Sequence, residues 1–146
     1  MAALDPEVQQ KIFKFESFIN DKLRADLAQL EKKIDEKNSE MAEFLQLKAT
    51  IKTLKTIGAD KDGFKTKVDI GENFFMHAHV EDASKILLDV GLGNYVEFTL
   101  DEALAVIDVR VKLFEKQVEN LRLEIAKTNA HIKLILIGIR ELQGID

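Results

Sequence analysis

The sequence predicts an α+β fold in which a long antiparallel two-helix coiled coil carries two β-hairpins, made of four short strands, between its helices. Three observations support this fold class: a heptad repeat over 100–142, a second apolar repeat over 8–54, and alternating apolar residues over 64–98. The first two patterns are typical of helices that pair along a seam, and the third is typical of strands. We therefore expect one domain over 1–146, with an N-terminal coiled-coil helix at 1–57, two hairpins at 64–99 and a C-terminal coiled-coil helix at 100–143.

The longest predicted helix begins at Leu100. Alternating steps of four and three residues lead from Leu100 to Leu142, and only Thr128 interrupts the apolar series. Such a spacing keeps one face of a helix against a partner as the two supercoil. Thr99 and Glu102 form a capping-box pattern at its start. At 1.5 Å per residue the helix spans about 65 Å, so it needs a second long helix to cover its seam.

The N-terminal segment supplies that partner. Asp5 followed by Pro6 marks a helix start, and Gly58 offers a C-cap after the last apolar residue. Between residues 19 and 30 the apolar steps add up to eleven rather than seven, so we expect the supercoil to loosen there. Because the strands return the chain to one end, the two helices should run antiparallel, with both termini at the far tip.

Residues 64–99 change from a helical period to a period of two. Apolar side chains fall on even-numbered positions, which predicts four strands that share one buried face. Turn-forming residues separate these strands at 71–73, 81–84 and 91–94, so the simplest arrangement is two successive hairpins.

The hairpins form a predicted assembly platform. Two hairpins alone leave strand edges unpaired and one apolar face poorly covered, which is marginal in water. Phe75, Leu87 and Tyr95 lie on the odd-numbered face, where a monomer would place polar residues; they indicate either assembly with other subunits or shielding of the coiled-coil base. The predicted oligomer interface comprises Val68, Ile70, Phe74, Phe75, Met76, Leu87, Leu88, Tyr95, Val96 and Phe98.

The predicted tip has more apolar side chains than one seam requires. Six of the eight residues over 132–139 are large and apolar, and Leu134 and Ile137 are surplus to the seam. This excess indicates a binding surface for client or partner proteins, or a third helix that packs there. The predicted binding tip comprises Val8, Ile12, Phe13, Phe15, Ile132, Leu134, Ile135, Ile137 and Ile139.

Composition restricts the function classes. The net charge is −5, and residues 58–99 hold eight acidic against four basic side chains, so the sequence offers no basic stripe for nucleic acid. It contains no cysteine, no apolar run of membrane-spanning length and no signal-peptide pattern. We expect a cytoplasmic and nuclear protein that contacts neither membranes nor nucleic acid directly.

No pattern predicts catalysis, a cofactor or a metal site. His77 and His79 share one face of a strand, but His131 is expected near the distal tip, too far away to complete a metal site. Gly91-x-Gly93 is too short for a dinucleotide fingerprint and is flanked by strands. We therefore expect a protein that is not an enzyme.

The order of helix, two hairpins and helix resembles the alpha class of prefoldin subunits. The segments that carry the resemblance are 90–97 and 99–103, and a narrower branch of the family is similar at 15–19, 68–75 and 140–144. The resemblance implies a hexamer in which hairpins of two alpha-class and four beta-class chains form a barrel. It also implies that the coiled-coil tips hold unfolded client proteins without ATP.

The resemblance also implies particular partners. They are beta-class prefoldin or prefoldin-like subunits, unfolded or assembling clients, and, for the narrower branch, RuvB-like ATPases and the RNA polymerase assembly machinery. The alternative function is a coiled-coil interaction scaffold that acts as a transcription cofactor. Such a scaffold would dock folded partners along its exposed flanks, for example at Glu115 and Glu119.

Overall fold

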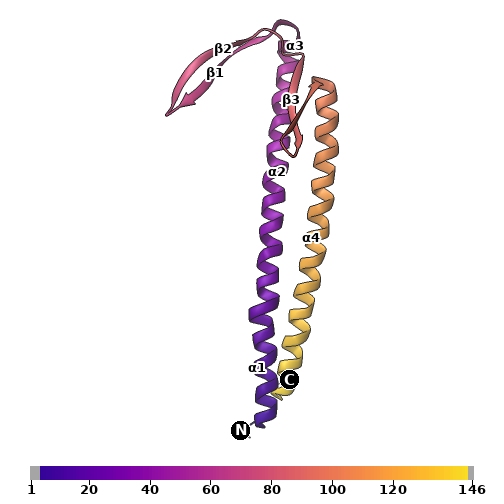
Figure 1. The fold of residues 1–146 in the computed structure, drawn as a ribbon. Coiled ribbons are helices and arrows are strands. Elements are labelled where there is room, and N and C mark those ends of the chain that lie inside the picture. Colours follow the sequence, from indigo (N-terminus) through magenta and orange to yellow (C-terminus); the bar gives the residue numbers. More distant parts are fainter. Residues whose placement is uncertain (1–3, 145–146) are drawn as a thin grey trace. The chain divides into compact units, whose positions relative to one another are not determined.

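A computed structural model describes residues 4–144, so the outermost residues of the predicted 1–146 domain, 1–3 and 145–146, lie outside the described part. The elements in chain order are α1 (Pro6–Ser17), the π-helical segment η1 (Phe18–Leu23), α2 (Arg24–Thr56), α3 (Ala59–Asp62), β1 (Phe64–Gly71), β2 (Phe74–Val80), β3 (Lys85–Gly91), β4 (Asn94–Thr99) and α4 (Leu100–Leu142) (Figure 1). The prediction of two long antiparallel helices packed together, with two β-hairpins between them, is confirmed.

The described residues form two compact units. The terminal unit comprises residues 4–39 and 114–144, and the hairpin unit comprises Glu40–Leu113. Each unit has its own apolar core, although α2 and α4 each contribute residues to both units. The buried core of the hairpin unit consists of Ile51, Leu88, Leu100, Ala103, Ile107 and Val111, and that of the terminal unit consists of Ile12, Ile19, Leu23 and Ile139.

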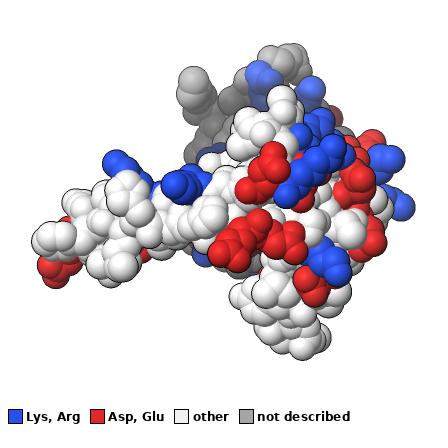
Figure 2. Space-filling model, turned by 90° about the horizontal axis from the view of Figure 1, so that it is seen from above, with Lys and Arg blue, Asp and Glu red and all other residues white. Residues whose placement is uncertain are grey.

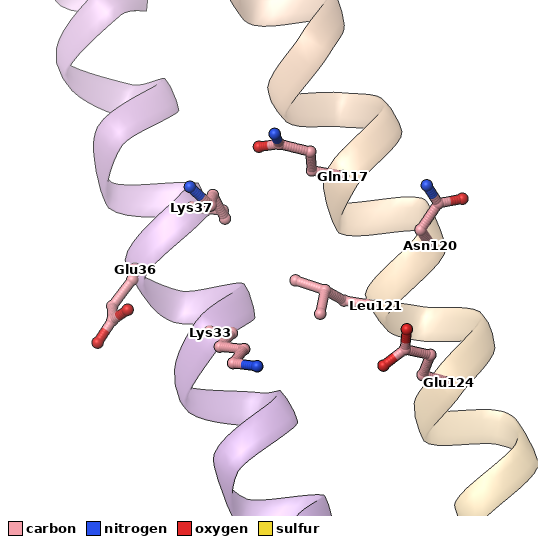
Figure 3. Close-up of a pocket in the computed structure, with 7 residues that line it drawn as sticks. All are labelled: Lys33, Glu36, Lys37, Gln117, Asn120, Leu121 and Glu124. Atoms are coloured by element: carbon pink, nitrogen blue, oxygen red, sulfur yellow. The ribbon is translucent and has the colours of Figure 1, made fainter. Parts of the chain in front are cut away.

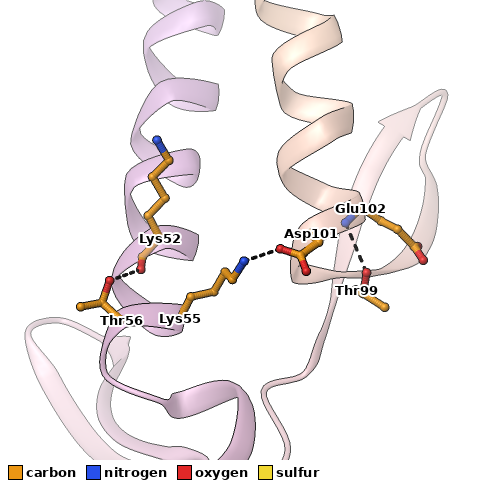
Figure 4. A network of polar contacts seen from close by, with 6 residues as sticks. All are labelled: Lys52, Lys55, Thr56, Thr99, Asp101 and Glu102. Atoms are coloured by element: carbon orange, nitrogen blue, oxygen red, sulfur yellow. Dashed lines mark hydrogen bonds and ion pairs between the residues drawn. The ribbon is translucent and has the colours of Figure 1, made fainter.

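Local signals in the sequence set the helix ends. The Asp5 carboxylate caps α1 by accepting a backbone N–H at 3.0 Å. Thr99 Oγ1 accepts the backbone N–H of Glu102 at 3.2 Å and so caps α4 (Figure 4). Gly58 takes a left-handed conformation, with φ of +74°, directly after α2. The predicted caps of both helices are thus confirmed.

Ion pairs join α2 to α4 within the hairpin unit. Lys55 pairs with Asp101 close to the start of α4 (Figure 4). Lys48 Nζ lies 2.5 Å from Asp108 Oδ1, and this hydrogen bond lowers the pKa of Asp108 below its ordinary value. Both ion pairs bridge α2 and α4 at exposed positions. Exposed pairs add little to the free energy of folding, so their main effect is to help fix the register of the two helices.

The predicted loosening of the first helix coincides with η1. The backbone N–H of Arg24 donates to the carbonyl of Ile19, five residues earlier, as in a π-helix. A π-helical turn shifts the phase of all later side chains around the helix. Ile19 and Leu23 are both buried. The π-helical shift allows this, although the next apolar residue, Leu27, follows Leu23 by four residues instead of the three that a heptad requires.

The two hairpins share the construction of their turns. Each is a separate two-stranded antiparallel sheet. The carboxylates of Asp69 and Asp89 accept the backbone N–H groups of Gly71 and Gly91 at 2.8 and 2.9 Å, and the strand register shifts at that point in both hairpins. Two residues with positive φ follow each glycine, as a type I′ turn requires. The two turns therefore repeat one local design.

The hairpins differ in what covers their apolar faces. Leu88 is only 6% exposed and packs against α2 and α4, with Ile86 and Phe98 beside it. In the first hairpin, Val68 and Met76 stand opposite each other and are 45% and 58% exposed. The prediction that all four strands share one buried face is therefore wrong for the first hairpin. The period of two identifies the apolar side of a strand but does not say whether the chain itself covers that side.

A close backbone contact fixes the junction before the first hairpin. Gly63 has a φ of +72°, and a Cβ added there would lie 2.1 Å from the carbonyl oxygen of Val80. Gly58 has nearly the same φ, but nothing lies within 4 Å of the Cβ position. Gly63 is thus constrained by both its conformation and its surroundings, whereas Gly58 is constrained by its conformation alone.

Gly63→Ala is expected to lower the free energy of unfolding by about 2–3 kcal/mol, because it adds a steric clash to an unfavourable φ. Gly58→Ala is the matched control and should cost about 1 kcal/mol. Urea denaturation followed by circular dichroism measures both values. An equal decrease in the free energy of unfolding for the two variants would show that the close contact with Val80 does not affect stability.

Candidate assembly and binding surfaces

The first hairpin has one apolar face. Residues that stand opposite each other on antiparallel strands share a face, and successive residues alternate between faces. The register places Val68 opposite Met76 on this face, together with the pairs Phe64–Val80 and Thr66–Ala78. Ile70 and Phe74, next to the turn, are 61% and 67% exposed. The first hairpin therefore presents apolar side chains that no other part of the described chain covers.

The structure divides the predicted interface residues into two groups. Leu88 is buried and Phe98 is partly buried against the chain's own helices, so both belong to the core of the hairpin unit. Within residues 4–144, nothing covers the remaining residues, which are more than one third exposed. These are Val68, Ile70, Phe74, Phe75, Met76, Leu87, Tyr95 and Val96.

The predicted tip residues divide in the same way. Five of them pack in or against the core of the terminal unit: Val8, Ile12, Ile132, Ile135 and Ile139. The other four are exposed and, together with Phe18 and Leu136, form what we call the tip patch: Phe13, Phe15, Phe18, Leu134, Leu136 and Ile137. Phe18 and Leu136 are absent from the predicted site, although both fall inside apolar-rich stretches of the sequence.

A cavity of about 440 Å³ opens beside the tip patch. Leu136, Ile137 and Ile139 form its apolar wall, while Glu16, Lys133, Arg140 and Gln143 complete its lining. The site thus combines apolar surface with charged groups at its edge, as is usual for surfaces that bind polypeptide.

A second cavity, of about 250 Å³, interrupts the seam of the terminal unit. In Figure 3, Gln117 and Leu121 of α4 point toward α2, whose Lys33 and Lys37 line the other side. Gln117 Oε1 is buried and has no hydrogen-bond partner among the described residues. A buried oxygen in this situation destabilises the helix pair.

Gln117→Leu is expected to raise the free energy of unfolding by about 1–2 kcal/mol, because it removes the unsatisfied oxygen and adds apolar contact. Lys116→Leu is the control, since Lys116 is exposed on the same helix and does not line the cavity. The control should change stability by less than about 0.5 kcal/mol. Thermal denaturation measures both changes. A destabilising effect of Gln117→Leu would contradict the conclusion that the buried Gln117 Oε1 weakens the helix pair.

Two further kinds of feature are absent from the described part of the chain. In residues 4–144, no three or more His, Cys, Asp or Glu side chains are grouped so that they could hold a metal ion. No helix in that range combines the length and the apolar character needed to cross a membrane.

The chain is similar to known proteins over nearly its whole length. It is 39% identical over 140 residues to Protein UXT homolog of Nematostella vectensis, with 96% of this chain and 88% of that protein covered. It is 35% identical over 137 residues to human Protein UXT, with 94% and 86% covered. Among solved structures, filamentous PFD from Methanocaldococcus jannaschii matches with a TM-score of 0.68 and 26% identity, covering 80% of this chain and 93% of that one.

The family model for prefoldin subunits matches residues 23–144. Prefoldin subunit alpha of Methanosarcina barkeri is 29% identical over 98 residues, with 67% of this chain and 68% of that protein covered. Prefoldins and UXT proteins are non-catalytic, so the prediction that this chain is not an enzyme is confirmed. The arrangement of two hairpins between two long helices, together with these similarities, shows that the chain belongs to the prefoldin family as an alpha-like member.

Proposed function

We propose that this chain is the alpha-type subunit of a prefoldin or prefoldin-like hexamer that works as a co-chaperone without ATP. Its hairpins assemble with beta-class subunits, and its tip patch binds client or partner proteins. The observation that carries this proposal is the exposed apolar face of the first hairpin.

A comparison of the two hairpins supports the assembly role. Both have the same bulge and turn, but only the second is covered by the chain's own helices. An isolated two-stranded hairpin is marginally stable in water, and monomeric proteins seldom leave a contiguous apolar face exposed. A hairpin from another subunit would cover this face and pair with its free strand edges. The structure of similar fold from Methanocaldococcus jannaschii is described as filamentous PFD, which supports the proposal that this chain assembles with other subunits.

The tip patch supports the binding role. Phe13 and Leu134 are 70% and 65% exposed, and the cavity beside the patch has an apolar wall. Non-native proteins expose apolar segments, which such a surface can bind without a fixed sequence. The patch takes side chains from the N-terminal and C-terminal helices of one unit, so it does not depend on the hairpins.

We also propose that the assembly works in the cytoplasm and the nucleus. RuvB-like ATPases and the RNA polymerase assembly machinery are the proposed wider partners, since the family resemblance implies them. The similarity to UXT proteins over most of the chain favours the branch of the family to which those partners belong.

In the assembled complex, replacing Leu134 and Ile137 with serine is expected to abolish suppression of aggregation of a heat-denatured reporter enzyme. The reason is that both side chains belong to the tip patch and are exposed. Light scattering of the reporter measures the effect. Leu113→Ser/Leu123→Ser is the matched control, because these residues are also exposed on α4 but lie outside the tip patch.

The same experiment separates a chaperone from a scaffold. Normal suppression by the Leu134/Ile137 variant would remove the client-binding role. If binding of a folded partner instead responds to charge reversal at the exposed Glu115 and Glu119, the chain acts as a scaffold along its flanks.

A further inference from the structure

The second face of the first hairpin is basic. The strand register pairs Lys65 with His79 and Lys67 with His77, and these four side chains share the face opposite Val68 and Met76. All four are exposed. We call these four residues the basic face.

The charge of the basic face is not neutralised within the described chain. The cross-strand register puts one carboxylate on this side, that of Asp69, which accepts the backbone N–H of Gly71 at 2.8 Å. Lys65 and Lys67 take no part in the ion pairs found between described residues. Figure 2 shows lysine side chains along this hairpin, with carboxylates at its turn.

Acidic groups limit the length of the basic face. Glu72 lies in the turn at one end of the hairpin, and Glu81 and Asp82 follow β2 at the other. The net charge of the whole chain is −5. A long polyanion such as nucleic acid would extend past the basic face into these carboxylates and be repelled. A short acidic segment would meet only the basic face.

We propose that the basic face of the first hairpin docks a short acidic segment of a partner polypeptide. Alternate side chains of an extended peptide point to one side at intervals of about 6.6–6.8 Å, the same spacing that separates Lys65 from Lys67 and His77 from His79. Phe75 is 58% exposed on the same side, opposite Asp69, and offers an apolar contact next to the charges. The segment that fits therefore has an acidic residue at every second position and an apolar residue at one end.

The charged groups that face His77 and His79 are Lys65 and Lys67 on β1, with Asp69 farther along the same strand. The basic face lies opposite Val68 and Met76, and the proposed docking site shares only Phe75 with the proposed assembly interface.

Fluorescence anisotropy tests the proposal with a labelled peptide of alternating glutamate and serine that ends in phenylalanine. Lys65→Gln/Lys67→Gln should weaken its binding by about tenfold. Lys32→Gln/Lys127→Gln removes the same charge from exposed positions on α2 and α4 and should change binding by less than about twofold. Amide NMR spectra show whether each variant keeps the hairpin.

Several results would overturn the proposal. One is the absence of peptide binding to the unmodified chain, and another is an equal loss in the control variant, which would indicate attraction by net charge alone. Equal or tighter binding of a thymidine oligonucleotide would assign the basic face to nucleic acid. Loss of peptide binding at concentrations where light scattering shows the chain to self-associate would assign the basic face to a contact between copies.

Discussion

Val68→Ser/Met76→Ser is expected to abolish assembly with beta-class subunits while leaving both long helices folded. The two residues stand opposite each other on the apolar face of the first hairpin and are exposed in the isolated chain. Burying each side chain under a neighbouring subunit would contribute about 1.5–3 kcal/mol. Losing both contributions weakens the complex by roughly 100-fold or more. Size-exclusion chromatography with light scattering measures the loss.

The opposite face supplies a matched control for this variant. Lys67→Ser/His77→Ser places serine at another pair of opposed residues on the same two strands, so it tests whether two such substitutions unfold the hairpin. We expect this control to assemble normally and to lose affinity for the acidic peptide. Failure of both variants to assemble would show that the hairpin had unfolded rather than lost its interface. Normal assembly of the Val68/Met76 variant would contradict the proposed interface.

Ile107→Ala is expected to lower the free energy of unfolding by about 2–5 kcal/mol. Ile107 is fully buried in the core of the hairpin unit, where α2, α4 and the second hairpin meet. The substitution leaves a cavity next to Ile51 and Leu88, because residues on three different elements cannot all shift to fill it. Chemical denaturation followed by helical circular dichroism measures the change.

Val109→Ala serves as the control for Ile107→Ala. Val109 lies two residues away on the same helix but is 67% exposed. Its substitution should change stability by less than about 0.5 kcal/mol. Comparable losses in the two variants would contradict the position of the core in the hairpin unit.

Helix ends and hairpin turns could be predicted from the sequence because short-range contacts determine them. The Thr99 cap needs only the backbone N–H of Glu102, three residues later. The turn after Gly71 likewise depends on neighbouring residues, including Asp69. Such interactions are complete within one turn or one bulge, so the sequence contains all the partners.

Burial depends on distant partners and could be predicted only in part. Val68 and Leu88 occupy equivalent places in two hairpins of the same design, yet only Leu88 meets the chain's helices. At the tip, the heptad spacing separated seam residues such as Ile139 from surplus residues such as Leu134, and the structure agrees with that separation. The basic face was not predicted, because pairing Lys65 with His79 requires the register of β1 on β2.

The central claim is that this chain is the alpha-type subunit of a mixed prefoldin hexamer assembled through its hairpins. Native mass spectrometry of the chain mixed with beta-class prefoldin subunits measures composition directly. We expect a hexamer that contains two copies of this chain and four beta-class chains. A chain that stays monomeric in the presence of every beta-class subunit tested would contradict it.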